Sequence, residues 1–344
     1  MSKHRFPYKW YLKDGYPKSH GLKVFGTFIC GGGSTMGYKL AGFEHLGGVE
    51  IDPEVADVYK TNHNPKYLFV EDIRGFADRK EFPEDLYNLD ILDGSPPCSS
   101  FSMAGNREKD WGKTKVFREG QAEQRLDDLF FDYIRLAKKL QPKVVIAENV
   151  KGLIQGNAKA YVHRIKKEFE AAGYKVQLFL LNAASMGVPQ KRERVFFICQ
   201  RNDLNFTKLN LQFNEEAIPF GNLFENIEYN DLTKNELYLW NNKIYGDGDF
   251  GVINVRLGNK QNSFTTKLLY KEKVCNTVTG GDNNILFDIP SKTTKNEVCQ
   301  IGTYPLDYNF KKIEPKYLIG MSVPPVMTAQ IATEIYNQWL KTGE

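Results

Sequence analysis

Short apolar runs of strand length alternate with helix-like stretches through the first two-thirds of the chain, and this alternation limits the fold more than any other feature. The helix-like stretches include Pro53–Tyr59, Leu129–Leu140 and Ala160–Ala172. In Leu129–Leu140 the apolar side chains recur every three or four residues and the basic ones fall between them, as on an amphipathic helix. Strands separated by helices predict a parallel sheet that is covered on both sides. The strand-like runs are Leu22–Ile29, Leu46–Ile51, Leu89–Leu92, Val144–Ala147 and Val195–Cys199.

The pattern changes after about Arg201. From Asn202 to about Leu269 the chain is rich in Asn, Lys, Tyr and Gly and has no clean helical period, so we expect a small, loop-rich second domain there. A helical pattern returns at Met327–Leu340, directly after the Pro324–Pro325 pair.

Composition excludes several classes of protein and leaves others open. A chain of 344 residues suits one large domain, or one large and one small domain. No apolar run reaches about 18 residues, so we expect no membrane span. The five cysteines are odd in number and scattered, which predicts a reduced, cytoplasmic protein rather than a disulfide framework. A net charge of +4 neither requires nor excludes a nucleic-acid partner.

A glycine-rich turn follows the first strand-like run, in the sequence FICGGGSTMG at Phe28–Gly37. Such a turn lets a ligand approach the backbone at the start of a helix. Glu50 ends the next run and suits the two hydroxyls of a ribose, and Asp72 suits an adenine amino group. Ile51 and Ile73 would close on the ring faces. The alternative is an ordinary turn with two helix-capping acids. The signal indicates an adenosine-containing cofactor and does not separate NAD from S-adenosylmethionine.

A cysteine follows two prolines just beyond the Leu89–Leu92 run. The Pro96–Pro97 pair stiffens the turn and can hold the Cys98 thiol toward the carboxyl edge of the sheet, where ligands bind in open α/β proteins. A thiolate is a strong nucleophile once its environment favours ionisation. The alternative is a buried structural cysteine. The strand end, the double proline and the flanking serines favour the functional interpretation.

Two other segments are expected to place charged side chains at the same carboxyl edge of the sheet. Glu148 leaves an apolar strand in the sequence ENV, and Gln190–Arg194 leads into the Val195–Cys199 run. Alternation along a strand would point Arg192 and Arg194 in the same direction. The two arginines would then hold a phosphate, or support a bound ring and Glu148. The alternatives are a strand-ending acid beside a helix cap, and a solvated run of charge.

These pieces occur in the order FxxGGG, EID, DIR, SPPCxxFS, ENV and QKRER, which resembles the cytosine-5 DNA methyltransferase family along nearly the whole chain. NTVTGG at Asn276–Gly281 and GMSVPPVM at Gly320–Met327 extend the resemblance. A nicotinamide dehydrogenase has no need of the SPPC turn, ENV or QKRER. The resemblance implies a Rossmann-like α/β methyltransferase sheet with helices on both faces, together with a smaller, loop-rich target-recognition domain.

The resemblance also implies a reaction and a role for each residue. A methyl group would pass from S-adenosylmethionine to carbon 5 of a flipped-out cytosine in a specific double-stranded DNA sequence, through a covalent Cys98 adduct. The product would be S-adenosylhomocysteine, and no metal would be needed. Glu148 would be the acid partner, and Arg192 and Arg194 would support the target base. The residues implied to line the cofactor site are Phe28, Gly31, Gly32, Glu50, Ile51, Asp72, Ile73, Pro97 and Leu129, with Ser322 and Val323 closing it.

The resemblance assigns residues 1–200 and 314–344 to the catalytic, cofactor-binding domain, and 201–313 to target recognition and a hinge. Ser99–Gln124 is expected to be a mobile, basic loop that closes over the flipped base. We expect a monomer with no membrane partner. A cognate restriction endonuclease, as in restriction-modification systems, is a candidate partner.

Two departures from the family pattern and two rival interpretations remain. The chain has Ile29-Cys30 where the family has Ala-Gly, and Met321 where most members have Asn. An RNA cytosine methyltransferase shares the motifs, but the Cys-Phe-Thr signature expected of it is absent from this chain. A non-catalytic binding module is opposed by the presence of Cys98, Glu148 and Arg194.

Overall fold

The computed structural model describes residues 4–97, 114–115, 124–125, 128–155, 158–225, 232–281 and 283–341. The chain forms two compact units, each assembled from three segments. The sheet unit comprises Tyr16–Asn182, Glu193–Gln212 and Thr328–Glu344. The small unit comprises Met1–Gly15, Ala183–Arg192 and Phe213–Met327.

A seven-stranded sheet organises the sheet unit. Its strands run parallel except β10, which is antiparallel to both of its neighbours. A parallel sheet throughout was the expectation, and β10 departs from it because only the short segment Ala183–Arg192 joins β8 to β10, too short for a crossover helix. The strands in sheet order are β3 (Tyr67–Val70), β2 (Glu44–Glu50), β1 (Lys23–Thr27), β4 (Ile91–Gly94), β7 (Val144–Val150), β10 (Glu193–Arg201) and β8 (Tyr174–Asn182).

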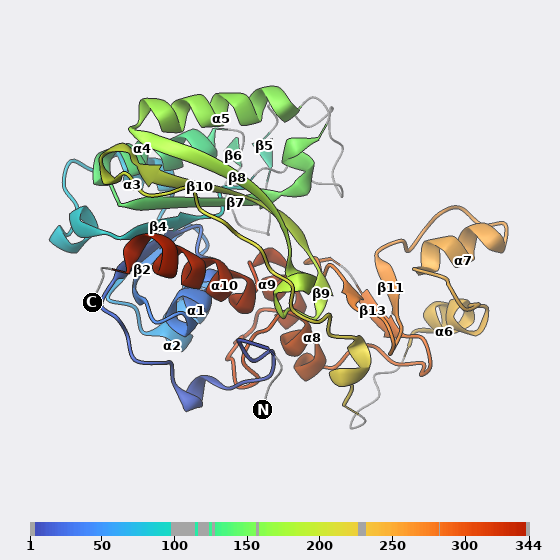
Figure 1. The fold of residues 1–344 in the computed structure, drawn as a ribbon. Helices are drawn as coiled ribbons and strands as arrows, with labels where there is room; N and C mark the ends of the chain where they lie inside the picture. Colours follow the sequence, from blue (N-terminus) through green and yellow to red (C-terminus); the bar gives the residue numbers. More distant parts are fainter. Residues whose placement is uncertain are drawn as a thin grey trace. The chain divides into compact units, whose positions relative to one another are not determined.

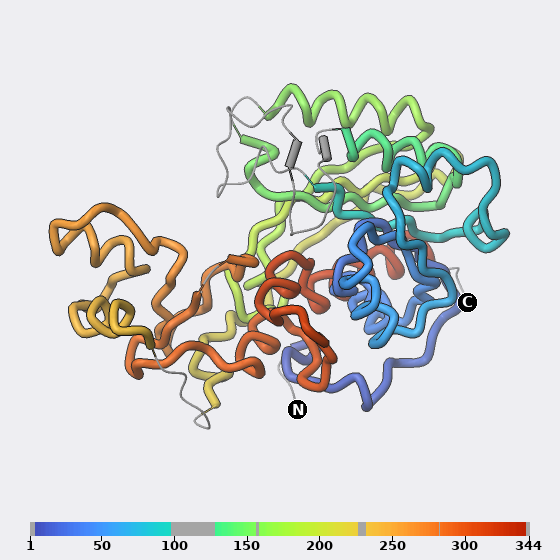
Figure 2. The backbone as a smooth tube through the Cα atoms, turned by 180° about the vertical axis from the view of Figure 1, so that it is seen from behind, coloured from blue at the N-terminus to red at the C-terminus, as the bar shows by residue number. Residues whose placement is uncertain are grey.

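Helices cover both faces of this sheet. Helices α4 and α5 lie on one face and α1 and α2 on the other (Figure 1), as the view from behind also shows (Figure 2). The α4 helix has the predicted bounds, and its Leu129, Tyr133, Leu136 and Leu140 side chains are all buried. The helices are α1 (Gly33–Leu40), α2 (Pro53–His63), α3 (Ile73–Asp78), α4 (Leu129–Leu140) and α5 (Lys159–Ala171). A short pair, β5 (Thr114–Lys115) and β6 (Gln124–Arg125), precedes α4.

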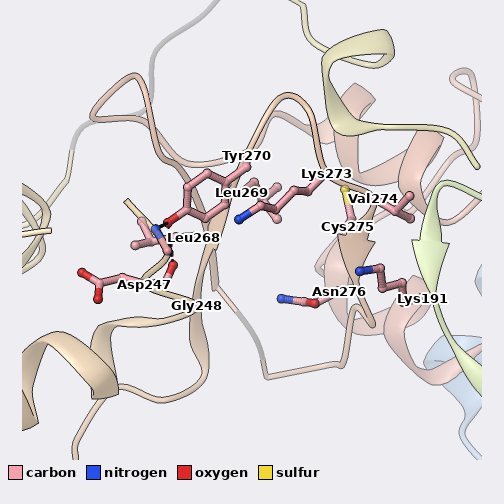
Figure 3. Close-up of a pocket in the computed structure, with 11 residues that line it drawn as sticks. Lys191, Asp247, Gly248, Leu268, Leu269, Tyr270, Lys273, Val274, Cys275 and Asn276 are labelled. Carbon is pink, nitrogen blue, oxygen red and sulfur yellow. Dashed lines mark hydrogen bonds between the residues drawn. The ribbon is translucent and has the colours of Figure 1, made fainter. Parts of the chain in front are cut away.

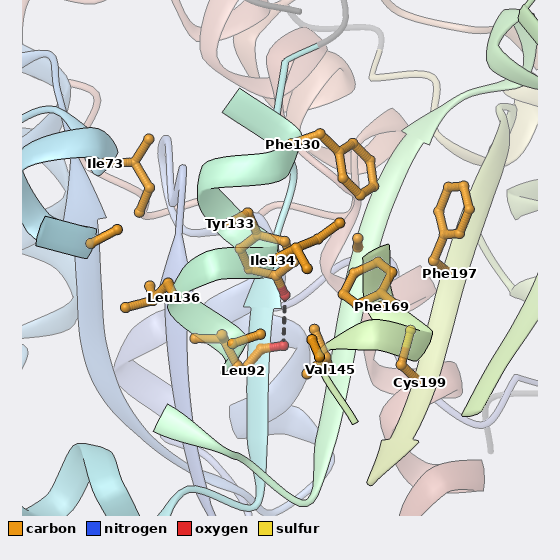
Figure 4. Packing of buried hydrophobic residues seen from close by; sticks show 14 of the residues in the cluster. Ile73, Leu92, Phe130, Tyr133, Ile134, Leu136, Val145, Phe169, Phe197 and Cys199 are labelled. Carbon is orange, nitrogen blue, oxygen red and sulfur yellow. Dashed lines mark hydrogen bonds between the residues drawn. The ribbon is translucent and has the colours of Figure 1, made fainter. Parts of the chain in front are cut away.

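The main apolar core lies between the sheet and α3, α4 and α5 (Figure 4). Alternate residues of each central strand enter it, so the residues between them face α1 and α2. At the centre of the core the Tyr133 hydroxyl shares its one proton between the carbonyls of Leu92 at 2.9 Å and Ile146 at 2.7 Å. Helix α4 is thereby fixed to β4 and β7, the two strands that lead to the predicted site.

The last helical segment begins in the small unit and ends in the sheet unit. Helix α10 (Pro325–Ile335) continues into a π-helical turn at Tyr336–Leu340. The Tyr336 ring stacks on His20 with ring centroids 4.3 Å apart, just before β1. The Trp339 indole donates to the Thr207 carbonyl at 2.8 Å, which also holds this end of the chain in the sheet unit.

The sequence predicts a loop-rich small unit, but this unit also contains regular helices and strands. Helices α6 and α8 both begin with the tetrapeptide Thr-Lys-Asn-Glu, and in each the Thr and Glu side chains form a capping box. Apolar clusters lie around Phe250 and around Phe220. The elements of this unit are β9 (Gln190–Lys191), α6 (Lys234–Asn241), α7 (Phe250–Arg256), β11 (Thr266–Leu269), β12 (Cys275–Asn276), β13 (Asn283–Leu286), α8 (Lys295–Ile301) and α9 (Pro315–Met321).

Within the described residues, no helix is both long enough and apolar enough to cross a membrane.

Candidate functional site

The glycine-rich turn between β1 and α1 has an unusual backbone. Phe28 (φ 53°), Cys30 (φ 47°) and Gly32 (φ 75°) all have left-handed conformations. Residues other than glycine adopt this region at a cost of about 1 kcal/mol or more, and such strain gathers at ligand-binding sites. Cys30 therefore occupies a position that would suit glycine, which is the residue the family pattern has there.

Ile29 fits beneath the turn because two glycines face it. Gly26 of β1 and Gly48 of β2 are paired across the sheet. A Cβ atom added at Gly26 would lie 2.7 Å from Ile29 Cγ2, and one at Gly48 would lie 2.4 Å from the same atom. Ile29 is 8% exposed. The two glycines thus provide the space that an isoleucine needs where the family has alanine.

We expect Gly26→Ala to lower the free energy of unfolding by about 1–3 kcal/mol, because the added methyl group overpacks the Ile29 site. Urea denaturation of the purified protein measures this change. In the double variant Gly26→Ala/Ile29→Ala, the smaller side chain vacates the space that the methyl group needs. The double variant should therefore be more stable than the sum of the two single effects predicts. Simple additivity would show that the two positions do not compete for space.

Glu50 ties the turn to the end of β2. Its buried carboxylate accepts the backbone N–H of Cys30 at 2.9 Å and that of Asp52 at 3.0 Å. Burial raises the pKa of Glu50, and backbone hydrogen bonds from Asp52, Cys30 and Ile51 oppose the shift. A carboxylate has about four acceptor sites, so these three bonds leave capacity for a ribose hydroxyl. Ile51, beside it, leaves 38% of its surface exposed.

Asp72 caps helix α3. Its carboxylate accepts the backbone N–H of Arg74 at 2.8 Å and also pairs with the Arg74 guanidinium at 2.9 Å. The side chain remains 35% exposed at the carboxyl end of β3, so it is accessible to a ligand while it caps the helix. Ile73 is 4% exposed and belongs to the apolar core. Leu129, at the start of α4, is also buried in that core.

The turn after β4 is connected to the end of β7. The Asn149 side-chain amide donates to the Pro96 carbonyl at 3.1 Å, and Pro97 follows as a half-buried residue. Cys98 and the predicted mobile loop Ser99–Gln124 lie outside the described residues, except for the backbone of β5 and of Gln124. The hydrogen bond therefore joins the ENV segment to the residues directly before the cysteine.

Glu148 and Arg194 form a buried ion pair across β7 and β10. Arg194 Nε lies 2.9 Å from Glu148 Oε1, and the side chains are 14% and 12% exposed. Burial lowers the pKa of Arg194, and the Glu148 charge opposes this shift. Both side chains lie on the sheet face opposite the α4 and α5 core. Strand β10 runs antiparallel to β7, so the first residues of β10 lie beside the carboxyl end of β7. Arg194 therefore lies at the same sheet edge as the glycine turn.

Arg192 does not share a strand with Arg194, contrary to the expected alternation. It lies between β9 and β10, in the small unit, because the extended pairing is interrupted there. Its buried guanidinium donates to the carbonyls of Val278 at 3.0 Å and Gly320 at 3.1 Å. These bonds join the NTVTGG segment to the GMSVPP segment.

Ser322 and Val323 also belong to the small unit, where both are buried. Ser322 Oγ accepts a hydrogen bond from the Tyr304 hydroxyl at 2.7 Å and donates one to the Leu318 carbonyl at 2.8 Å. Met321 is 46% exposed. Three of the predicted site residues, Arg192, Ser322 and Val323, belong to the small unit, and the Ile73 and Leu129 side chains are buried in the core. The structure places the others that it describes at one edge of the sheet unit: Phe28, Gly31, Gly32, Glu50, Ile51, Asp72, Pro97, Glu148 and Arg194.

The small unit contains a cavity of about 100 Å³ whose lining mixes apolar side chains with two lysines, Lys191 and Lys273, and one acid, Asp247 (Figure 3). Lys191 and Asn276 lie next to each other because β9 pairs with β12. Lys273 Nζ lies 3.9 Å from the centre of the Tyr270 ring. Sequence reasoning did not single out this cavity, because its lining comes from segments far apart in the chain. Among the described residues, no group of three or more His, Cys, Asp or Glu could hold a metal ion.

Comparisons with known proteins identify relatives of this chain. Type II methyltransferase M.FnuDI of Fusobacterium nucleatum is 38% identical over 192 residues, which are 56% of this chain and 51% of that protein. The chain thus spans about half the length of that relative, and likewise of M.NgoPII of Neisseria gonorrhoeae. Type II methyltransferase M1.HphI of Haemophilus parahaemolyticus is 28% identical over 95% of this chain and 90% of its own length.

Solved structures confirm the predicted fold class. Spodoptera frugiperda DNMT2, solved as a mutant, has a TM-score of 0.62 at 18% identity and covers 92% of this chain and all of its own. The S. pombe Dnmt2 methyltransferase also has a TM-score of 0.62, at 15% identity, and covers 93% of this chain and all of its own. The family model of C-5 cytosine-specific DNA methylases matches residues 22–337, which include every motif from the glycine turn to GMSVPP. The chain therefore belongs to the C-5 cytosine-specific DNA methylase family, as its ordered motifs predicted.

Proposed function

We propose that the protein transfers a methyl group from S-adenosylmethionine to carbon 5 of cytosine in a specific sequence of double-stranded DNA. The observation that carries this proposal is the buried Glu148–Arg194 pair, which lies at the same sheet edge as the glycine turn and the Pro96–Pro97 turn that precedes Cys98. Family membership supports the reaction, and Glu50 with the exposed Ile51 suits the ribose and adenine of the cofactor.

The chain's own residues would divide the chemistry between them. Cytosine is unreactive at carbon 5 until a nucleophile adds to carbon 6, so the Cys98 thiolate would form that bond with a base flipped out of the duplex. The electron pair displaced from the C5–C6 double bond makes carbon 5 nucleophilic. Bound S-adenosylmethionine supplies an electrophilic methyl group. Loss of the carbon 5 proton and departure of Cys98 would restore the ring.

Glu148 would hold the reacting base. Its carboxyl group can accept from the exocyclic amine of cytosine and bond to the ring nitrogen at position 3, which stabilises the charge that Cys98 addition places on the ring. Arg194 holds Glu148 in one orientation through the 2.9 Å contact. We assign Arg192 a positioning role, because its guanidinium binds two backbone carbonyls.

Under this proposal, residues 1–200 and 314–344 form the catalytic domain, and residues 201–313 read the DNA sequence and contain the hinge. This functional division differs from that of the two compact units, in which residues 1–15, 183–192 and 314–327 belong to the small unit and 201–212 to the sheet unit. The protein would act as a monomer beside a cognate restriction endonuclease. Sequencing of a plasmid library methylated by the purified protein tests the activity, the base and the target site together. Cytosine-5 methylation confined to one short sequence is expected. Methylation of RNA alone, or of no nucleic acid, would refute the proposal.

We further propose that the cavity lysines of the small unit contact DNA phosphates. Replacing both Lys191 and Lys273 with alanine should weaken DNA binding and reduce the slope of log K against log[salt] by about one to two, because up to two counterion-releasing contacts are lost. Fluorescence anisotropy at several salt concentrations measures the slope. Lys60→Ala, which removes an exposed lysine of α2, serves as the control. An unchanged slope in the double variant would exclude these contacts.

A further inference from the structure

Asp93 is a buried carboxylate at the centre of the sheet edge, and none of the motifs above includes it. It is the third residue of β4 and is 8% exposed. It pairs in register with Gly26 of β1 on one side and Ile146 of β7 on the other. The chain leaves β1 toward β2 and leaves β4 toward β7, so Asp93 lies at the topological switch point of the sheet. Ligands of open α/β sheets bind at that point.

Two side chains of α1 hold the Asp93 carboxylate. The buried Tyr38 hydroxyl donates to Oδ1 at 2.9 Å, and the Ser34 hydroxyl also hydrogen-bonds to it. Ser34 and Tyr38 are four residues apart and so lie on one face of α1, the helix that begins at the glycine turn. Asp93 therefore connects the start of the cofactor turn to the strand that leads to Cys98.

The carboxylate has no cationic partner among the described side chains. The titratable groups that interact electrostatically with Asp93 are Tyr38 from α1, Tyr59 from α2 and Glu148 from β7, together with Tyr133 from α4 on the opposite face of the sheet. Arg194, on the same sheet face, is already paired with Glu148 at 2.9 Å. Burial raises the pKa of Asp93 to about 7, the Tyr38 hydrogen bond opposes this shift, and the Glu148 charge adds to it.

The reaction determines where a positive charge must lie in this site. The methyl group moves from a sulfonium sulfur to carbon 5 of a base whose carbon 6 is bonded to Cys98. The sulfur must therefore lie between the turn after β1 and the turn after β4. Asp93 lies at the base of both turns. The sulfur is cationic before transfer and neutral afterwards, because the S–CH₃ bonding pair stays on sulfur while the methyl group leaves.

We propose that Asp93 is a positioning residue whose carboxylate stabilises the cationic sulfonium cofactor relative to its neutral thioether product. This inference rests on the proposed function. Removing an opposite charge from a partly buried site changes an equilibrium by about tenfold or more. Asp93→Asn should therefore weaken S-adenosylmethionine binding about tenfold and change S-adenosylhomocysteine binding less than about twofold. Both ligands carry the same amino-acid group, so their difference isolates the charge on sulfur.

Proton linkage provides a second measurement. A cation that binds next to Asp93 lowers its pKa, so S-adenosylmethionine should release a proton when it binds near pH 7. Its affinity should rise between about pH 6 and pH 8, whereas the product's affinity should not. Tyr38→Phe removes the hydrogen bond that favours the ionised carboxylate and should move this rise to higher pH.

Isothermal titration calorimetry of the full chain with both ligands tests the proposal, in two buffers of different ionisation enthalpy. Asp90→Asn is the matched control, because Asp90 is a buried aspartate directly before β4, where it pairs with Lys143 at 2.7 Å. Selective loss of S-adenosylmethionine affinity and of proton release in Asp93→Asn alone would support the proposal. Equal loss for both ligands, or no loss, would overturn it while the wild-type protein still methylates DNA. If the wild type binds neither ligand, the proposed function fails as well.

Discussion

Replacing Cys98 with serine is expected to reduce DNA methylation by at least about a thousandfold, because a hydroxyl is far less ionised and far less nucleophilic than a thiol at neutral pH. Transfer of a radiolabelled methyl group to duplex DNA measures the rate. A duplex with 5-fluorocytosine at the target gives a second readout, because fluorine cannot leave as a cation and the covalent adduct should persist on a denaturing gel. Cys98→Ser should form no such adduct.

Cys199→Ala is the matched control for this experiment. Cys199 is a residue of β10 whose side chain is fully buried in the core, and burial raises the pKa of its thiol well above the usual range, so it should not react. The control variant should keep the adduct. Turnover within a few-fold of wild type in Cys98→Ser, or an adduct in that variant, would remove the covalent step from the proposal.

Glu148→Gln is expected to lower the methylation rate by about 10²–10⁴-fold, because glutamine cannot supply the proton or the negative charge that the reacting ring requires. The amide oxygen can still accept from Arg194 Nε, so the protein should remain folded. Binding of S-adenosylmethionine should change little, since Glu148 lies on β7 and the glycine turn follows β1. Single-turnover kinetics with calorimetric binding separate the two effects.

A double-mutant cycle distinguishes catalysis from structural support at this pair. Arg194→Met should destabilise the protein by about 3–5 kcal/mol, because it leaves the Glu148 charge buried without its partner. Combining Arg194→Met with Glu148→Gln should recover much of that stability and none of the activity. Recovery of activity in the double variant would mean that Glu148 acts only as the partner of Arg194.

The parts of the fold that could be predicted were those with a local pattern. Helix α4 has the expected bounds because its buried face repeats at the helical period. Strand β8 was missed although Leu178–Leu181 is an apolar run of strand length. It is an edge strand, and its Leu178 and Leu180 side chains stay exposed. The antiparallel direction of β10 depends on the length of the connection before it. Helix α6 did carry a local signal, the Thr233–Glu236 capping box, which composition obscured.

In the candidate site, too, some residues could be predicted from a local pattern and others only from the tertiary structure. Glu50, Glu148 and Arg194 were predictable because a charged residue at the end of an apolar strand must lie at the sheet edge. Arg192 and Arg194 have the same local sequence pattern. Only the tertiary structure shows that the Arg192 guanidinium donates to the carbonyls of Val278 and Gly320. Asp93 was overlooked because strand β4 has only four residues. In the sequence an acid at its third position looks like the polar end of the strand rather than a buried strand residue. Its contacts with α1 depend on tertiary packing alone.

The Gly26–Gly48 pair beneath Ile29 has a consequence for protein engineering. The glycine-rich segment of this chain cannot be transferred to another protein by itself. If it were grafted into a relative that carries larger residues at those two strand positions, its isoleucine would clash with their side chains. The reverse graft, with alanine in place of Ile29, would leave a void beneath the turn. Chimaeras of these enzymes should therefore exchange β1, the turn and β2 as one block.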